Sequence, residues 1–516
     1  MMKKYFAALG LMLFANITLS AQAPQDDDHP IVDVVIDASC SDDEAIDESA
    51  EDYFYPTKAY RYRVTLKDKK NNPYSVKRPE EFLSKKALDR RKKLGIKVDQ
   101  YDLPITPCYL QSLQSAGVKI HNMSKWNNTV VVEVKDTAQA EALLALNFVK
   151  EVKKVWEQVD SISRDDNKFL LTAVLQGIVP MDSANYYMDE DRRALLSNKL
   201  PKMHDDYGNG LTAVDMLKLQ TLHEMGFRGQ GMTVAVIDGG FRNVDLIEAF
   251  KDCKIIGTKN FAHPGFSIYR EFEDHGTMVF STLATNREFQ MVGTAPEASY
   301  LLLQSEDGLT EQLVEEDNWC AAVEYADSIG VDLITTSLGY YAFDDKTTSH
   351  KYEEQDGMTA INSRSASLAA SRGLLVLNSA GNEGDGAWKK IGFPADAKDI
   401  LTVGAVNEKE VNTVFSSLGN TADGRIKPDV MAFGEYVPMI NDSGSLVYAS
   451  GTSFSCPIMC GAVTCLWQAF PNKKPVEIIR AVQAAGHMAK RPNNVFGYGI
   501  PNMNVAYKIL DGNNNR

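Results

Sequence analysis

The chain has 516 residues, 44% of them hydrophobic, and is too long for one ordinary hydrophobic core, so two or three folded units are predicted. A formal net charge of −15 excludes a protein that binds nucleic acid by neutralising phosphates, because there is no excess of basic residues. We therefore expect no nucleic-acid partner.

The N-terminal residues have the pattern of an export signal. Lys3 and Lys4 precede an apolar stretch at 5–14, and small residues follow up to Ala21, a pattern typical of a signal peptide at 1–21. The apolar stretch is shorter than a membrane span, and no later segment is long and apolar enough to be one. We expect a protein without a membrane span, secreted to the periplasm or the extracellular space.

An acidic segment follows the signal. Residues 26–52 contain twelve Asp or Glu and no Lys or Arg. Such a run repels itself and buries little surface, so residues 22–54 are predicted to be a disordered tail in preference to a calcium-binding segment.

Residues 55–157 predict a small α+β domain, because strand-like and helix-like segments alternate over about a hundred residues. Strands are expected at 60–66, 118–121, 129–134 and 149–156, and helices at 79–94, 106–117 and 137–147. The domain contains no convergent catalytic set, and His121 is interpreted as structural. The charged segment 158–207, with Asp-Arg-Arg at 191–193, is predicted to be a linker that a protease can reach.

Residues 208–512 follow a different pattern. A helix is expected at 211–225, ending at Gly226, and a later one at 311–329. Between the helices lie continuous apolar runs at 233–237, 300–303, 331–337, 374–378 and 400–406. Continuous apolar strands indicate an α/β domain with a parallel sheet flanked by helices, in which functional residues gather at the carboxyl ends of the strands.

Ser453 is the candidate nucleophile. It follows Gly-Thr at the start of a helix rich in small and apolar residues, whose first turn we expect to contain Pro457. Unpaired N–H groups and the helix dipole at such a terminus favour a developing negative charge, as an acyl-transfer nucleophile requires. Helix capping is the commoner use of Ser at this position.

Three other residues could complete a catalytic set. Asp238 ends a buried strand and could orient an imidazole or cap a turn. His275 precedes Gly-Thr, which lets a helix begin beside the imidazole, although a lone His is more often structural. Asn382 lies in a Gly-rich loop, where its amide could be an oxyanion donor or a turn residue.

Four segments closely resemble, in order, the signature blocks of the subtilases, which are subtilisin-like serine endopeptidases: Val-Ile-Asp-Gly-Gly-Phe, Asp-His-Gly-Thr, Ser-Ala-Gly-Asn-Glu-Gly and Ser-Gly-Thr-Ser-Phe-Ser-Cys-Pro. The resemblance covers about 208–510, including Gly-Tyr-Gly-Ile-Pro-Asn-Met-Asn near the C-terminus. It implies a peptidase with Ser453 as nucleophile, His275 as general base and then acid, and Asp238 as its orienting carboxylate.

The resemblance also implies roles outside the triad. An oxyanion hole would use the Asn382 side chain and the Ser453 N–H. The substrate would pair as an added strand with the segment Ser337, Leu338 and Gly339. The side chain before the scissile bond would fill a pocket lined by Ser379, Ala380 and Gly381. No cofactor is required by this chemistry, and a structural calcium ion is not derivable from the sequence.

The sequence departs from the family's signature blocks at two places. Gly239-Gly240 stands where many relatives have Thr-Gly, and Met278 where many have a second His, but no reacting group is lost.

The domain at 55–157 resembles subtilase propeptides in size and position. Its segments Phe-Leu-Ser-Lys-Lys-Ala-Leu-Asp-Arg-Arg and Ser-Lys-Trp-Asn-Asn look like those of secreted Bacteroides-type subtilases, which implies a zymogen whose own N-terminal domain is an intramolecular inhibitor.

Other interpretations remain open at this point. The chain could be a catalytically silent binding module on the same fold, or a peptide ligase or cyclase that passes the acyl group to an amine. Seven cysteines show no metal-binding spacing, and a disulfide such as Cys253–Cys320 is compatible with the sequence without being derivable from it.

Overall fold

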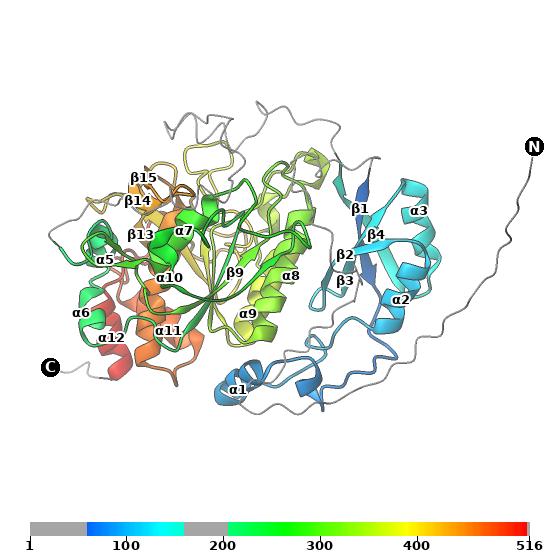
Figure 1. Cartoon of the computed structure of the whole chain (residues 1–516), viewed down its shortest axis with the longest axis horizontal. Helices are drawn as coiled ribbons and strands as arrows, with labels where there is room; N and C mark the ends of the chain where they lie inside the picture. Colours follow the sequence, from blue (N-terminus) through cyan, green and yellow to red (C-terminus); the bar gives the residue numbers. More distant parts are fainter. Residues whose placement is uncertain (1–58, 159–204, 513–516) are drawn as a thin grey trace, which may run out of the picture. The chain divides into compact units, whose positions relative to one another are not determined.

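The computed structural model describes residues 59–158 and 205–512 (Figure 1). The expected signal peptide, the acidic tail and residues 159–204 of the linker lie outside these ranges. The two larger sheets lie one in each of the two predicted domains, an antiparallel sheet in the N-terminal domain and a parallel sheet in the C-terminal domain.

The N-terminal domain is built on a four-stranded antiparallel sheet in the order β2-β3-β1-β4. The strands are β1 (Tyr60–Leu66), β2 (Lys119–Ser124), β3 (Thr129–Val134) and β4 (Val149–Glu157), and the helices are α1 (Lys85–Leu94), α2 (Pro107–Ser115) and α3 (Thr137–Ala142). Val64, Val130 and Val132 from the sheet form a common core with Leu113 from α2. The interleaved α+β pattern predicted for this region is thus present.

Two helices predicted in this domain are each divided. The segment expected at 79–94 is a 3₁₀ turn, η2 (Pro79–Glu81), followed by α1, because Ser84 caps α1 by accepting the N–H of Ala87 at 3.1 Å. Gly95 ends α1 in a left-handed conformation (φ 70°), as expected. The helix expected at 137–147 similarly ends at Ala142 and continues as η3 (Leu143–Ala145).

The C-terminal domain contains a seven-stranded sheet in the order β13-β12-β11-β10-β5-β9-β6, whose neighbouring strands are all parallel. This confirms the predicted parallel sheet. The strands are β5 (Thr233–Asp238), β6 (Lys254–Asn260), β9 (Ser299–Gln304), β10 (Leu333–Thr336), β11 (Leu375–Ser379), β12 (Leu401–Val406) and β13 (Val430–Phe433). Two small hairpins accompany it, β7 (Asn286–Arg287) with β8 (Met291–Val292) and β14 (Val437–Ile440) with β15 (Leu446–Ala449).

Helices cover both faces of this sheet (Figure 1). Along β5, Val234 and Val236 join the apolar core that includes α7 (His275–Ala284) and α10 (Thr452–Ala469). The alternate residues Ala235 and Ile237 join the core that includes α8 (Val314–Ile329) and α9 (Ile361–Ser371). The shorter helices α11 (Pro475–Ala484) and α12 (Met503–Asp511) pack with the first core. Within the described ranges, no helix has both the length and the apolar character needed to span a bilayer.

The helix predicted at 211–225 is wrong as a single element. It is divided into α5 (Leu211–Met216) and α6 (Gln220–Glu224), with Lys218 between them in a left-handed conformation (φ 54°). Leu217 and Leu219 are both fully buried in the same core. Residues two apart lie on different faces of a continuous helix, and the break at Lys218 lets both leucines point into the same core.

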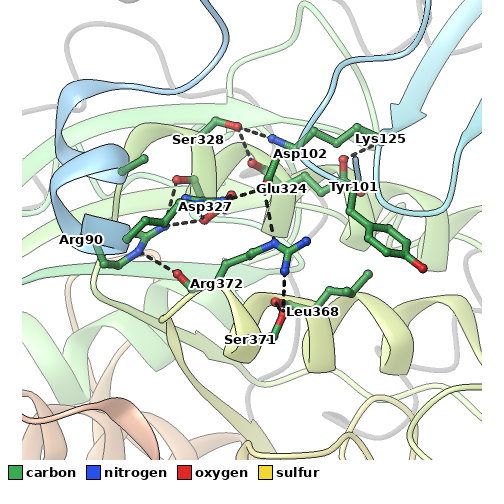
Figure 2. Close-up of polar contacts among 12 residues, drawn as sticks. Arg90, Tyr101, Asp102, Lys125, Glu324, Asp327, Ser328, Leu368, Ser371 and Arg372 are labelled. Carbon is green, nitrogen blue, oxygen red and sulfur yellow. Dashed lines mark hydrogen bonds and ion pairs between the residues drawn. The ribbon is translucent and has the colours of Figure 1, made fainter. Parts of the chain in front are cut away.

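Polar contacts join the two domains along α8 (Figure 2). Asp317 accepts two hydrogen bonds from Arg63, and the Asp327 carboxylate binds the guanidinium groups of Arg90 and Arg91. Glu324 accepts hydrogen bonds from the loop after β2, at Ser124, Lys125 and Trp126. Apolar residues of the N-terminal domain, Trp126, Val131 and Trp156, also extend the core under α8 and α9.

The described cysteines form no disulfide: Cys108, Cys253, Cys320, Cys456, Cys460 and Cys465 are all free. The Cys253 thiol donates to the Ala284 carbonyl at 3.2 Å, and Cys320 accepts from Ser365 at 3.3 Å. The Cys253–Cys320 disulfide considered from sequence is therefore absent, because each sulfur has a different neighbour.

Candidate active site

Asp238 and His275 meet at the carboxyl edge of the parallel sheet. Asp238 is the last residue of β5 and His275 the first of α7, and His275 Nδ1 lies 2.6 Å from Asp238 Oδ1. The same oxygen accepts the Gly239 N–H at 2.8 Å, and the Asp238 side chain is fully buried. A carboxylate at Nδ1 holds the proton on that nitrogen and leaves Nε2 as the proton acceptor.

The charges around His275 favour its protonated form. Burial alone would lower the pKa of this imidazole, but the Asp238 carboxylate, with contributions from Glu273 and Asp274, outweighs burial and raises the pKa above its ordinary value. An imidazolium formed during a reaction would therefore be stabilised where it is formed.

Glycines allow the two elements to approach. A Cβ atom on Gly276 would lie 2.4 Å from the Gly240 carbonyl oxygen, and one on Gly240 would lie 2.5 Å from the Glu273 carbonyl oxygen. Residues larger than glycine at these positions would separate α7 from the end of β5. The second glycine of Gly239-Gly240 is thus required by this packing, while Met278 is a buried core residue of α7.

Ser453 is the second residue of α10 and has no acceptor for its backbone N–H within the described part of the chain. Pro457 lies in the second helical turn, and not in the first as expected from sequence. Because proline has no N–H, the carbonyl of Ser453 loses its usual partner four residues later. The Ser337 hydroxyl donates to that carbonyl instead at 2.7 Å, and Ser453 Oγ lies 3.3 Å from the Ser337 carbonyl.

The orientation of the Asn382 amide is fixed by Thr452. Asn382 Oδ1 accepts both the backbone N–H and the hydroxyl of Thr452, each at 2.9 Å. The Nδ2 group has no acceptor in the described ranges. It lies beside the residue that precedes α10, because a Cβ on Gly451 would be 3.5 Å from it. Two hydrogen-bond donors, this amide and the Ser453 N–H, are therefore available at the N-terminus of α10.

The predicted substrate segments follow neighbouring strands. Ser337, Leu338 and Gly339 come directly after β10, and Ser379, Ala380 and Gly381 begin at the last residue of β11. Gly339 is exposed, and no partner for its N–H or C=O exists within the described residues, so a peptide could pair with it. Gly381 is held to the start of α10 by the Thr452 hydroxyl at 3.1 Å.

Sequence reasoning missed the supporting residues. Thr452, which orients Asn382, and the Ser337 hydroxyl, which binds the Ser453 carbonyl, were not singled out for these roles. Pro457 four residues after Ser453 was the one signal that a carbonyl there would need another donor. Within residues 59–158 and 205–512, no group of three or more His, Cys, Asp or Glu side chains is arranged to hold a metal ion.

Two family models match this chain. The subtilase family model, peptidase S8, matches residues 229–499, and a peptidase S8 propeptide model from Bacteroidota matches residues 61–168. Subtilisin NAT of Bacillus subtilis subsp. natto is 28% identical over 295 residues, 57% of this chain and 69% of that protein. An intracellular serine protease of Paenibacillus polymyxa is 30% identical over 248 residues, 47% of this chain and 68% of that protein.

Two solved structures are also similar. The self-cleaved protease domain of PatA is 23% identical, with a TM-score of 0.44 over 55% of this chain and 98% of that one. The prenylagaramide maturation protease PagA is 20% identical, with a TM-score of 0.44 over 57% and 98%. Because the family model alone covers more than half of the sequence, the chain belongs to the subtilase family of serine proteases, which are hydrolases, and carries a Bacteroidota-type propeptide domain before its subtilisin-like domain.

Proposed function

We propose that the protein is a secreted, self-processing serine endopeptidase that cleaves peptide bonds through an acyl-enzyme on Ser453. The observation that carries the proposal is the 2.6 Å contact between Asp238 and His275 at the sheet edge from which α10 also begins. Asp238, His275, Ser453 and Asn382 would then form one catalytic set, as in other subtilases.

The reaction follows from the roles of these groups. Ser453 Oγ attacks the substrate carbonyl carbon while His275 Nε2 takes its proton, and the carbonyl oxygen becomes an oxyanion. The Asn382 amide and the Ser453 N–H stabilise this charge. His275 next gives the proton to the leaving amine, and water, deprotonated by His275, releases the acid and restores the Ser453 hydroxyl.

The substrate would bind as an extended strand beside 337–339. Strand addition needs a free N–H and C=O, and the backbone of Gly339 has no partner for either group in the described part of the chain, which supports this mode of binding. The side chain before the scissile bond would enter the space lined by 379–381.

The domain at 55–157 would act as an intramolecular inhibitor until the linker at 158–207 is cut. Its buried ion pairs with α8 support a stable association with the peptidase domain. In this proposal the signal peptide occupies 1–21, the acidic tail 22–54 and the mature peptidase 208–512.

An active-site probe tests the proposal. An organophosphate should label the mature protein at Ser453, and Ser453→Ala should give an unlabelled, inactive chain that remains at precursor length. Ser443→Ala, at an exposed position, is the matched control and should behave as wild type. A wild-type chain that neither binds the probe nor cleaves any peptide library would indicate a silent binding module instead.

A further inference from the structure

Two carboxylates close to Asp238 take no part in the proposed reaction. Glu273 lies two residues before His275, and Glu306 lies on the segment after β9. The Cβ and Cγ atoms of Glu306 are each 3.8 Å from the position of a Cβ on Gly239, directly beside Asp238. Both carboxylates therefore border the triad without exchanging a proton or forming a bond in the proposed reaction.

The order of strands places these carboxylates on one side of the substrate segment. In the sheet, β10 has β11 on one side and β5, followed by β9, on the other. Residues 379–381 therefore flank segment 337–339 on one side, and Gly239 with the segment after β9 flanks it on the other. The Tyr340 hydroxyl donates to Glu306 Oε1, which ties Glu306 to the end of the substrate segment.

An extended peptide presents successive side chains to these two sides in turn. If the residue before the scissile bond enters the space at 379–381, the preceding residue faces Glu306. The side chain of this second residue before the scissile bond therefore faces the side of the site that carries the Glu273 and Glu306 carboxyl groups.

Glu273 has no polar partner among the described residues. It is only 8% exposed, yet its carboxylate forms no hydrogen bond or ion pair within the described ranges. Its Oε1 is 2.9 Å from the position of a Cβ on Gly308, a residue with positive φ (69°), so Gly308 packs directly against this side chain and a larger residue there would displace it. A buried carboxylate without a partner is costly, and a cation is the group that satisfies it.

The surroundings of the two carboxylates carry an excess of negative charge. The pKa of Glu273 is raised to about 8 by burial and then by Asp274, and that of Glu306 is raised to about 8 by burial and then by Glu311. The titratable groups that face them are Asp238, Glu271, Asp274, His275, Glu311, Glu315 and Tyr340, while the nearby Arg242 guanidinium is paired with Asp442 at 3.4 Å.

We propose that Glu273 and Glu306 form a subsite that selects a lysine or arginine side chain at the second residue before the scissile bond. This specificity rests on the proposed peptidase function. A primary ammonium or guanidinium group would give the Glu273 carboxylate a partner that it does not have among the described residues.

The test compares two quenched fluorescent peptides that differ only in lysine or norleucine at this position, with enzyme matured from the full chain. At pH 9 we expect kcat/KM to be about 10- to 100-fold higher for lysine, the scale of hydrogen bonds to a charged group. Glu273→Gln and Glu306→Gln should each lower this ratio about tenfold. Glu224→Gln, at an exposed position on α6, is the charge-matched control and should leave it unchanged.

The ratio in the wild type should also rise with pH through about 8, because both carboxyl groups must lose their protons to bind a cation. Equal kcat/KM for the two peptides in the wild type, or a ratio that survives in both variants, would overturn the subsite. A protein that cleaves neither peptide and binds no organophosphate would instead contradict the peptidase function itself. The two failures are thus distinguishable.

Discussion

The buried pair Arg63–Asp317 offers a direct measure of how the N-terminal domain is held. Arg63 on β1 donates from Nε to Asp317 Oδ1 at 2.7 Å and from Nη2 to Oδ2 at 2.6 Å, and both side chains are buried. The geometry is bidentate, which is the strongest arrangement for this pair of groups. Arg63→Met retains the apolar length of the side chain but leaves the Asp317 carboxylate buried and unpaired.

The size of the effect follows from that burial. Removing one partner of a buried ion pair costs about 3–5 kcal/mol, which corresponds to binding weakened by about 10²- to 10⁴-fold. The assay is inhibition of the mature peptidase by the separately produced domain at 55–157, measured with a fluorogenic peptide. The Ki should rise by this factor for Arg63→Met, whereas Arg78→Met, at an exposed position, should leave it unchanged.

A double-mutant cycle separates the pair from other effects. In the peptidase, Asp317→Asn removes the charge that Arg63→Met would leave unpaired, so the two changes together should cost less than their sum. We expect a coupling energy of at least about 2 kcal/mol. If the wild-type domain inhibits and the coupling is near zero, the contact does not hold the domains together and the reasoning from burial is wrong.

Three further predictions concern the catalytic set. Asn382→Leu should lower kcat by about 10²- to 10³-fold with little change in KM, which is the loss found on removing one oxyanion-hole donor in subtilisin itself. Unchanged turnover would make Asn382 only a turn residue. Neutral His275 must accept a proton and its pKa is raised above 6.5, so kcat/KM should fall as the pH drops through that higher value. Asp238→Asn should move this acidic limb of the pH profile to lower pH and reduce kcat by about 10⁴-fold. An acidic limb that stays in place would exclude Asp238 as the cause of the raised pKa. Ser337→Ala should lower the free energy of unfolding by about 1–3 kcal/mol, because the Ser453 carbonyl loses its donor, and an unchanged melting curve would contradict this role.

The parallel sheet could be predicted from sequence because its strands are buried on both faces. Runs such as 233–237 and 400–406 are continuously apolar, and this pattern has few alternatives when helices lie between the runs. The helix breaks could not be predicted in the same way. The interruption at Lys218 depends on a tertiary core that buries both Leu217 and Leu219, and no local pattern specifies that core.

The motif residues could be found from sequence, but their supports could not. Asp238 and His275 stand at recognisable junctions, the end of a buried strand and the start of a helix. Thr452 orients Asn382 across 70 positions of sequence, and Ser337 reaches the carbonyl of Ser453 across 116. Such contacts depend on strand order, which the sequence pattern leaves open.

The negative charge of the chain has a structural consequence along α8. Asp317, Glu324 and Asp327 are spaced by seven and three residues, so they share one face of the helix, and all three are buried against the N-terminal domain. Arg63 binds the first of them, and Glu324 accepts hydrogen bonds from the loop after β2. Arg90 and Arg91 bind the last, and Figure 2 shows the contact of Arg90 with Asp327. Without that domain, the three carboxylates on α8 would lose these cationic and N–H partners together and would have to be hydrated. The free energy needed to remove these carboxylates from water is therefore offset only while both domains are present. The contact between the domains thus depends on charge pairing as well as on apolar burial.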